Sequence, residues 1–209
     1  MKPSPAALRR PLPPVAPLLL GSGSPRRREL LARAGVAFEV QAADIDERPR
    51  PGEAPRALAA RLACEKARAV ARRLGPEPPR LVLGADTIVV LDGEVLGKPQ
   101  DRADAERLLG RLVGRVHEVL TAVALVTSAD LAARSVVVAS RVWMRPAEPE
   151  EIRRYVATGE PLDKAGAYAA QGEGRRFIAR IEGSETNVIG LPIEETLTLL
   201  REAGLDGVD

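Results

Sequence analysis

The sequence predicts a mixed α/β (α+β) protein in which a mixed, twisted sheet is flanked by helices. First, 45% of the 209 residues are apolar, which is enough for a sizeable core. Second, helical and strand patterns alternate irregularly, without the regular strand-helix-strand repeat of a purely parallel sheet. Third, Asp92 and Gly93 separate two strand-like segments, and an Asp-Gly dipeptide in that position predicts an antiparallel hairpin.

The first elements can be placed from their turn and cap residues. Four prolines from Pro11 to Pro17 would break a signal-type helix, so we expect a flexible leader over residues 1–16 and a single domain over residues 17–209. A short buried strand at 17–20 leads to Ser24, which has N-cap chemistry, and Pro25 suits the first helical position. Gly35 then ends a helix of about ten residues.

The later elements follow from apolar periodicity and turn residues. Further strands are expected at 36–41, in the hairpin that begins at residue 81, and at 116–127, 131–144 and 176–183. Further helices are expected at 54–74, 103–113, 149–157 and 193–203.

Composition excludes several classes of function. The net charge is only +2 and aromatic residues make up 2% of the chain, so neither a basic tail nor a base-stacking platform is present, and we expect no nucleic-acid partner. No apolar run approaches the ~20 residues of a membrane helix, so we expect no membrane association. The lone cysteine, Cys64, fits a reducing compartment, and we expect a cytoplasmic protein.

The stretch LLLGSGSPRRREL, Leu18 to Leu30, leads from a strand through a Gly/Ser turn into a helix that begins with three arginines. Free amides and the positive end of a helix dipole suit an anion there. The stretch lacks the Gly-Lys-Ser/Thr of a P-loop, and Arg26 replaces the third glycine of a dinucleotide fingerprint. Phosphate binding and an ordinary helix start both remain open for this loop.

Asp86 interrupts an apolar strand, on the same face as Val82, Ile88 and Val90. A buried carboxylate is costly unless it meets a metal or a cation. The alternative is a structural hydrogen-bond acceptor beside a glycine bulge at Gly84.

Only four of the 31 basic residues are lysines: Lys2, Lys66, Lys98 and Lys164. Lys66 lies in the centre of the apolar stripe of its helix, where an ammonium needs an anion unless it snorkels to the surface. Pro99 holds Lys98 extended just after the hairpin, and Lys164 follows in a glycine-rich segment. Several cations and one strong acid around a cleft indicate a phosphate-ester site. No serine triad is plausible, because the only histidine, His117, lies in a strand and is interpreted as structural.

Six sequence blocks resemble, in the same order and spacing over about Leu18 to Leu200, the Maf or septum-formation proteins. The blocks are GSGSPRRREL (21–30), DIDE (44–47), EKA (65–67), GADTIVVLDGEVLGKP (84–99), EPLDKAGAYAAQG (160–172) and GSETNVIGLPI (183–193). The resemblance implies two lobes around a nucleotide cleft, similar to inosine triphosphate pyrophosphatases. It also implies a nucleoside triphosphate pyrophosphatase that cleans the nucleotide pool, with a link to division arrest.

The same resemblance assigns site residues. Arg26, Thr87 and Gln171 match the specificity positions of the branch that hydrolyses dTTP and UTP, whereas the 7-methyl-GTP branch typically has Trp, Gln and Glu there. Asp86 matches the proton acceptor. The other matching polar cleft positions are Ser22, Arg27, Glu47, Lys66 and Lys98.

The resemblance further implies Mg²⁺ or Mn²⁺ held by Glu47 and Asp86, a pyrimidine nucleoside triphosphate as substrate, and a homodimer. The sequence departs from the family pattern at Ala169, where glycine is usual, and at Glu185, where tyrosine is usual. The alternative function is a regulator of division that senses nucleotide or binds nucleic acid, with the cleft used for binding without turnover.

Overall fold

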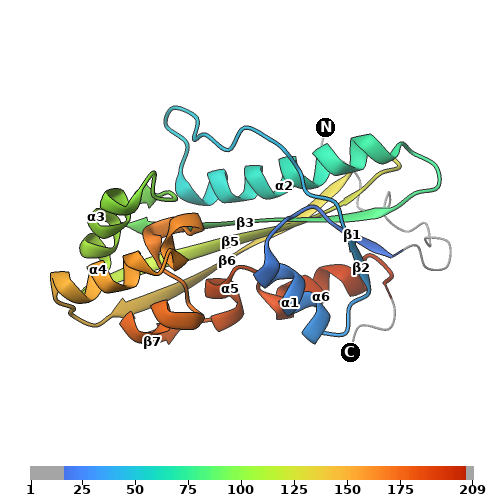
Figure 1. Cartoon of the computed structure of the whole chain (residues 1–209). Coiled ribbons are helices and arrows are strands. Elements are labelled where there is room, and N and C mark those ends of the chain that lie inside the picture. Colours follow the sequence, from blue (N-terminus) through green and yellow to red (C-terminus); the bar gives the residue numbers. More distant parts are fainter. Residues whose placement is uncertain (1–16, 206–209) are drawn as a thin grey trace.

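The computed structural model describes residues 17–205, so the leader predicted for residues 1–16 lies outside the described residues. One sheet of seven strands runs through the molecule in the order β2-β1-β3-β5-β6-β7, with β4 paired to β3 (Figure 1). β1 is parallel to both β2 and β3, and the other pairings are antiparallel. The predicted mixed sheet is therefore confirmed.

The strands are β1 (Leu18–Leu20), β2 (Phe38–Val40), β3 (Leu81–Leu91), β4 (Glu94–Leu96), β5 (Val116–Thr127), β6 (Ala133–Met144) and β7 (Ile178–Glu182). The helices are α1 (Pro25–Arg33), α2 (Pro55–Leu74), α3 (Arg102–Leu112), α4 (Pro149–Ala157), α5 (Glu185–Ile189) and α6 (Ile193–Glu202). Three short 3-10 turns follow α4: η2 (Glu160–Asp163), η3 (Ala165–Ala167) and η4 (Gly172–Phe177).

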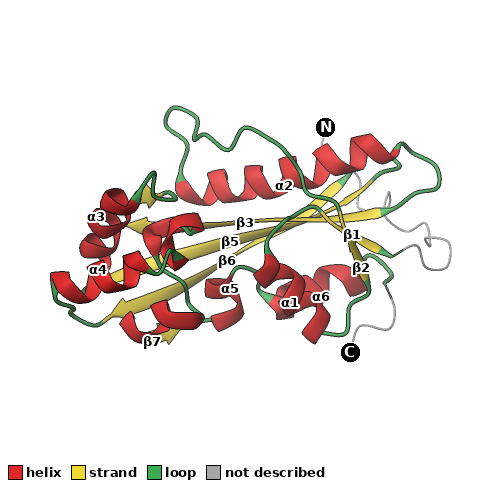
Figure 2. Cartoon of the chain, viewed as in Figure 1, coloured by secondary structure: helices red, strands yellow, loops and turns green. Residues whose placement is uncertain are grey.

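Helices cover both faces of the sheet (Figure 2). α2 lies along one face, and α1, α5 and α6 lie on the other, while α3 and α4 pack at one end of the long strands (Figure 1). Side-chain alternation along β3 explains the two layers: Val82 packs against α2, and Leu83 packs on the side of α1 and α6.

Two main apolar clusters lie at opposite ends of the sheet. One joins α3, α4, β4 and the turns after α4, and the other joins β1, α1 and α6. The long strands β3, β5 and β6 connect the two ends, which gives the expected two-lobed arrangement (Figure 1). No helix within residues 17–205 is long and apolar enough to span a membrane.

Most predicted elements are confirmed within one or two residues, including the hairpin at Asp92 and Gly93. The strand predicted at 36–41 is shorter, because only Phe38–Val40 pair with β1. The strand predicted at 176–183 begins at Ile178, since the preceding residues form η4. Helix α5 was not predicted; it is only five residues long and lacks a readable apolar period.

Candidate active site

A cleft of about 930 Å³ opens between the β1–α1 loop, the loop before α2, the part of α2 up to Lys66, β3, β4 and the turns after α4. Eight of the nine predicted site residues line it: Ser22, Arg26, Arg27, Glu47, Lys66, Asp86, Thr87 and Lys98. These residues come from five separate stretches of sequence (22–27, 47, 66, 86–87 and 98), and the fold brings them to one cavity.

Asp86 and Lys66 form a buried ion pair at the floor of this cleft. Lys66 Nζ lies 2.6 Å from Asp86 Oδ1, and the two side chains are 11% and 8% exposed. Lys66 therefore does not snorkel to the surface, and Asp86 meets the cation that a buried carboxylate needs. A buried carboxylate that is held by only one of its oxygens keeps acceptor capacity on the other.

The close approach of α2 to β3 makes this pair possible. A Cβ at Gly84 would lie 2.3 Å from Ala63 O and 2.8 Å from Ala67 N, so the helix crosses the strand at a residue without a side chain. The bulge considered at Gly84 is absent, since Gly84 pairs in regular register with Ala124.

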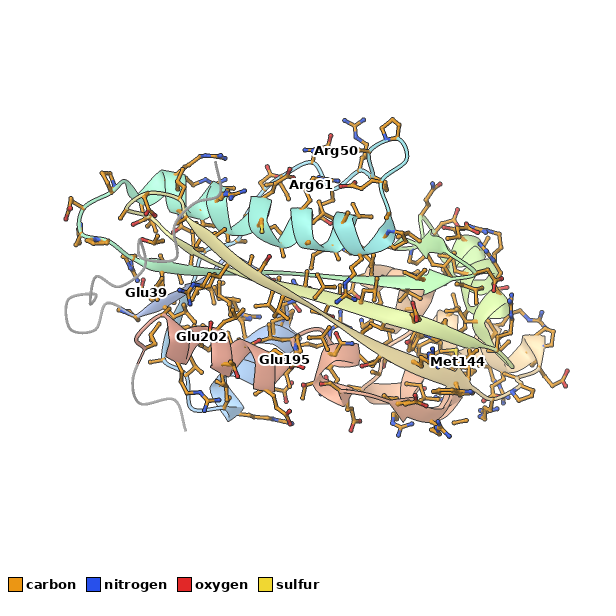
Figure 3. The ribbon with its side chains drawn as sticks, turned by 180° about the vertical axis from the view of Figure 1, so that it is seen from behind. Glu39, Arg50, Arg61, Met144, Glu195 and Glu202 are labelled. Carbon is orange, nitrogen blue, oxygen red and sulfur yellow. The ribbon has the colours of Figure 1, made fainter. Side chains whose placement is uncertain are left out.

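Glu47 brings a second carboxylate to the same ammonium. Glu47 Oε1 lies 2.8 Å from Lys66 Nζ, and its side chain is 48% exposed. The loop that carries it is fastened to α2 by Arg61, which binds Glu53 (2.6 Å) and donates to Arg48 O (3.1 Å). Figure 3 labels Arg61 on α2 below this loop. Lys66 thus brings Glu47 and Asp86 together, and Arg61, which lies outside the cleft, fastens the loop that carries Glu47.

The electrostatic environment separates the two carboxylates. Burial raises the pKa of Asp86 above its usual value, although Lys66 and Arg27 oppose this effect. Burial also disfavours the ionised form of Glu47, but Lys66, Lys98 and Arg27 outweigh it and lower the pKa of Glu47. Asp86 is therefore the better proton acceptor of the two, and Glu47 is the more firmly ionised.

Arg27 anchors the β1–α1 loop to the sheet. Its Nη1 donates to Ser22 Oγ (3.0 Å) and Ala85 O (2.8 Å), its Nη2 to Thr87 Oγ1 (3.1 Å), and its Nε to Gly190 O (2.8 Å). Of its five N–H donors, only one remains for a ligand. Arg27 thus positions the loop as much as it supplies charge.

The start of α1 presents backbone donors to the same cavity. The first helical bond runs from Arg28 N to Ser24 O, so the amides of Arg26 and Arg27 lie ahead of the intrahelical ladder. Ser24 is the N-cap as predicted, but its side chain makes no capping bond. Arg28 is exposed and does not line the cleft.

Two cationic side chains in the cleft have no partner among the described residues. Within residues 17–205, the side chains of Arg26 and Lys98 make no hydrogen bond or ion pair with the protein. Lys164 also lines the cleft, but its Nζ donates to Glu160 O (2.7 Å) and contacts Asp163. A phosphate chain entering the cleft would therefore meet free positive charge on both sides.

Thr87 and Gln171 differ from the remaining predicted residues. Thr87 Oγ1 lies 2.9 Å from Thr121 Oγ1 and also accepts from Arg27, so its hydroxyl is already engaged. Gln171 does not line the cleft; it follows Ala170, which does, and is partly exposed at the start of η4. The family resemblance assigns Gln171 a place among the specificity positions, but in this structure Gln171 stands outside the cleft lining.

His117 is structural, as interpreted from the sequence. It is 3% exposed, and its Nε2 lies 2.8 Å from the hydroxyl of Tyr168. Burial lowers the pKa of His117 to about 4, so the ring is neutral at pH 7.

The carboxylates suit a cation that is shared with a substrate. Within residues 17–205 no group of three or more His, Cys, Asp and Glu side chains could hold a metal ion alone. Asp86 and Glu47 each use one oxygen on Lys66, which leaves the second oxygen of each as a ligand. Mg²⁺ typically takes one or two carboxylates, waters and substrate phosphates, so the two residues fit that ion.

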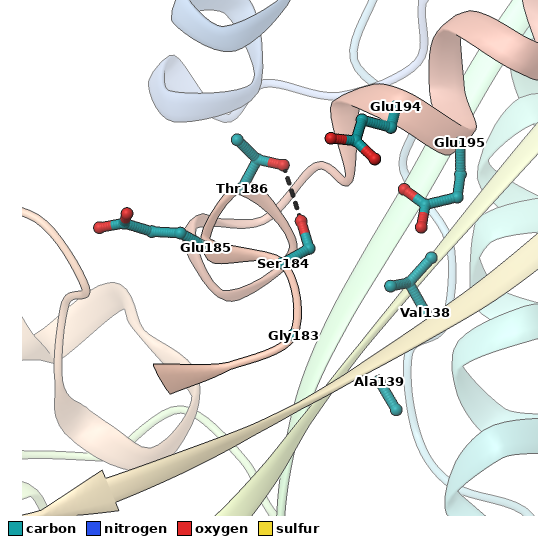
Figure 4. A pocket seen from close by; sticks show the side chains of 8 residues that line it. All are labelled: Val138, Ala139, Gly183, Ser184, Glu185, Thr186, Glu194 and Glu195. Atoms are coloured by element: carbon teal, nitrogen blue, oxygen red, sulfur yellow. Dashed lines mark hydrogen bonds between the residues drawn. The ribbon is translucent and has the colours of Figure 1, made fainter. Parts of the chain in front are cut away.

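A second, smaller cavity of about 510 Å³ lies between β6, α5 and the start of α6 (Figure 4). Glu185 lines this cavity and points away from Glu194 and Glu195, so the departure from the family pattern at Glu185 lies outside the cleft. The other departure, Ala169, is buried and has no left-handed backbone, so alanine fits there without strain.

Several cleft residues were not predicted as site residues. Asp163 and Tyr168 line the cleft from the turns after α4, and residues 188–190 line it from the end of α5. The block EPLDKAGAYAAQG signalled the first group, but no local pattern connects Gly190 to Arg27, which lies 163 residues away.

Comparisons with known proteins identify the family to which this chain belongs. A sequence model described as Maf-like protein matches residues 17–203. The dTTP/UTP pyrophosphatase of Anaeromyxobacter dehalogenans (strain 2CP-1) is 54% identical over 189 residues, which cover 90% of this chain and 94% of that protein. The dTTP/UTP pyrophosphatase of Geobacter metallireducens is 50% identical over 193 residues, 92% of this chain and 99% of that one.

A solved structure from Mycobacterium abscessus, titled a nucleoside-triphosphatase and dITP/XTP pyrophosphatase, aligns with 93% of this chain and 99% of its own, with a TM-score of 0.43 and 15% identity. The match over residues 17–203, together with relatives about half identical over nine-tenths of the sequence, shows that this chain belongs to the Maf-like protein family.

Proposed function

We propose that this protein is a nucleoside triphosphate pyrophosphatase that hydrolyses dTTP and UTP to the monophosphate and pyrophosphate. The observation that carries the proposal is the Asp86–Lys66 pair at the floor of a cleft lined by free cations. The relatives named dTTP/UTP pyrophosphatase support the substrate class. The proposal includes removal of unwanted pyrimidine triphosphates in the cytoplasm, with a link to division arrest.

In the proposed reaction, a water molecule attacks the α-phosphorus of the bound triphosphate. Asp86 accepts one proton from that water as the new P–O bond forms, and its raised pKa suits a general base. The bond between the α-phosphorus and the oxygen that bridges to the β-phosphorus breaks, and that oxygen leaves with pyrophosphate. The products are therefore the nucleoside monophosphate and pyrophosphate.

Positive charge stabilises the phosphates as negative charge shifts to the leaving group. Lys98 is free to bind the phosphates of the substrate directly. Lys66 holds Asp86 and adds its own positive charge. The remaining N–H of Arg27, Ser22 Oγ and the free amides at the start of α1 offer further donors.

We infer that Glu47 and Asp86 hold Mg²⁺ or Mn²⁺ together with the triphosphate. When bound, the ion would neutralise phosphate charge and act as a Lewis acid. When no ion is bound, Lys66 keeps both carboxylates in place, because the Lys66 ammonium contacts one oxygen of each carboxylate.

We further propose that Arg26, Thr87 and Gln171 select the pyrimidine base. Arg26 has free donors in the cleft, whereas Thr87 would act through its engaged hydroxyl and Gln171 would have to turn inward from the start of η4. An amide can pair with a uracil-type edge through both its donor and its acceptor. The homodimer implied by the family resemblance is part of the same proposal.

The experiment is a screen of pyrophosphate release over canonical and modified nucleoside triphosphates with Mg²⁺ or Mn²⁺. We expect dTTP and UTP to be the best substrates, with the monophosphate as co-product. Binding without turnover would favour a nucleotide-sensing regulator instead. Preference for 7-methyl-GTP would overturn the branch assignment.

A further inference from the structure

The cleft wall formed after α4 contains no regular strand or α-helix. Between Gly159 and Phe177 the chain makes the turns η2, η3 and η4, next to α4 and β7 in Figure 1. This segment contributes Asp163, Lys164, Ala165, Tyr168 and Ala170 to the cleft. Because such turns lack a continuous backbone ladder, other bonds must hold the wall in place.

Gly166 N donates to Gly97 O (3.0 Å) near the start of the segment, and one carboxylate and one hydroxyl supply the bonds that hold its second half. Glu160 Oε1 accepts from Gly174 N (2.9 Å) and from Tyr155 Oη (3.0 Å), and Glu160 Oε2 accepts from Glu173 N (3.0 Å). Tyr155 Oη in turn accepts from Ala169 N (3.1 Å). We call these two side chains the Tyr155–Glu160 clamp; it ties the end of α4 to Ala169 in the middle of the glycine-rich stretch and to Glu173 and Gly174 at its end.

The clamp is packed tightly. Tyr155 is fully buried, and its ring lies 5.3 Å from that of Phe177. A Cβ at Gly174 would lie 2.6 Å from both Tyr155 Oη and Ala169 O, so only glycine allows the contact. Burial opposes ionisation of Glu160, but the amides of Gly174 and Glu173 and the Tyr155 hydroxyl outweigh it and lower its pKa.

We infer that Tyr155 and Glu160 are positioning residues that hold this wall in the nucleotide-binding conformation, and so set substrate affinity and base selection without taking part in the chemistry. Neither residue lines the cleft, whereas residues on either side of Ala169 do. Gln171 lies between the two bonds that the clamp makes at Ala169 and Gly174, so its placement depends on the same clamp. This inference rests on the proposed function and specifies how that site selects its substrate.

The expected effect is on KM and not on kcat. In Glu160→Gln one amide oxygen must accept all three bonds that the two carboxylate oxygens accept in the wild type. The ordered conformation of the wall therefore becomes a minor state of the unliganded protein. The apparent affinity then falls in proportion to the fraction in the competent state, and bound substrate restores that state at saturation. We expect KM for dTTP, and Kd for its α,β-methylene analogue, to rise about tenfold with kcat within about twofold.

Tyr155→Phe removes the same link from its other end, and we expect a similar rise in KM. KM of the double variant should be about the same as KM of the more impaired single variant, because the two residues act as one unit. Glu150→Gln is the matched control: it removes an exposed α4 carboxylate that is paired with Arg153, and it should leave KM unchanged.

Backbone hydrogen exchange reports on the clamp without reference to activity. In Glu160→Gln the amides of Ala169, Glu173 and Gly174 should exchange at least tenfold faster than in the wild type, whereas amides of β5 should not change. Unchanged exchange would overturn the clamp. Faster exchange with unchanged KM and Kd, or a fall in kcat alone, would overturn its role in substrate affinity.

Failure of the proposed reaction gives a different result. A wild-type protein that binds the methylene analogue but releases no pyrophosphate would refute the proposed pyrophosphatase activity. The predicted tenfold rise in Kd for Glu160→Gln would still test the role of the clamp in affinity. A wild-type protein that binds neither dTTP nor its analogue would overturn both.

Discussion

Replacing Lys66 with methionine tests the electrostatics of the cleft floor. Methionine fills a similar volume, so the main loss is the ammonium that lies 2.6 Å from Asp86. Removing one partner of a buried ion pair typically costs about 3–5 kcal/mol, because the other charge is left uncompensated. Since Asp86 is 8% exposed and Lys66 is 11% exposed, the low end of that range applies. We expect the free energy of unfolding of Lys66→Met to fall by about 3 kcal/mol at pH 8.

The deficit should depend on pH. The pKa of Asp86 is already raised in the folded protein, and loss of Lys66 raises it further, so the folded state binds a proton more readily than the unfolded chain. A carboxyl group whose pKa is higher in the folded state than in the unfolded chain stabilises the fold at a pH below its unfolded-state pKa. This stabilisation is lost as the pH rises through the folded-state pKa. The deficit of Lys66→Met relative to the wild type should therefore be largest at pH 8 and shrink towards pH 5.

Urea unfolding without divalent metal, at pH 5, 6, 7 and 8, measures this curve. Arg72→Met is the control, since Arg72 is an exposed cation on the same helix, and it should change stability by less than about 0.5 kcal/mol. Adding Asp86→Asn to Lys66→Met should recover part of the loss and flatten its pH dependence. A deficit below about 0.5 kcal/mol at pH 8, or one that is flat with pH, would refute the reasoning.

Four other predictions concern separate parts of the molecule. Gly84→Ala should lower the free energy of unfolding in urea by about 2 kcal/mol or more, because its Cβ would lie 2.3 Å from Ala63 O; a neutral effect would contradict the close helix crossing. Arg27→Lys keeps the charge but not the four bonds, so kcat/KM for dTTP should fall at least tenfold; wild-type kinetics would mean that only charge matters. The pKa of His117, about 4 when folded, favours the neutral ring, so its contribution is present above pH 6.5 and lost as pH falls towards 4. His117→Gln should remove about 2 kcal/mol of the wild type's stability loss between pH 7 and pH 5, and unchanged pH dependence would contradict this. Chelation should abolish pyrophosphate release, and added Mg²⁺ or Mn²⁺ should restore it; activity that survives chelation would exclude the proposed metal.

The fold could be predicted from local signals wherever those signals were strong. The Asp92-Gly93 turn and the apolar stripe of α2 gave the hairpin and the long helix. The short helix α5 and the turns after α4 escaped prediction, because their conformation depends on distant partners. Glu160, for example, holds η4 through bonds to residues 13 and 14 positions away.

The site could be predicted as a set of charged residues but not as a geometry. Lys66 and Asp86 were each singled out as ionisable residues at costly positions, and the structure pairs them. The roles within the set needed the structure: Arg27 is mainly an anchor, and Gln171 stands outside the lining. Which donors are already engaged depends on contacts such as Gly190 O, and a linear sequence does not encode them locally.

The most direct test of the proposed chemistry is the rate of pyrophosphate release from saturating dTTP by Asp86→Asn. Asparagine keeps the size of Asp86 but cannot accept the proton of the attacking water, and general-base assistance contributes roughly 10²- to 10⁴-fold. We predict that kcat falls by at least about 100-fold, while the variant remains folded and binds the α,β-methylene analogue of dTTP. Near wild-type turnover by Asp86→Asn would contradict the assignment of Asp86 as the proton acceptor.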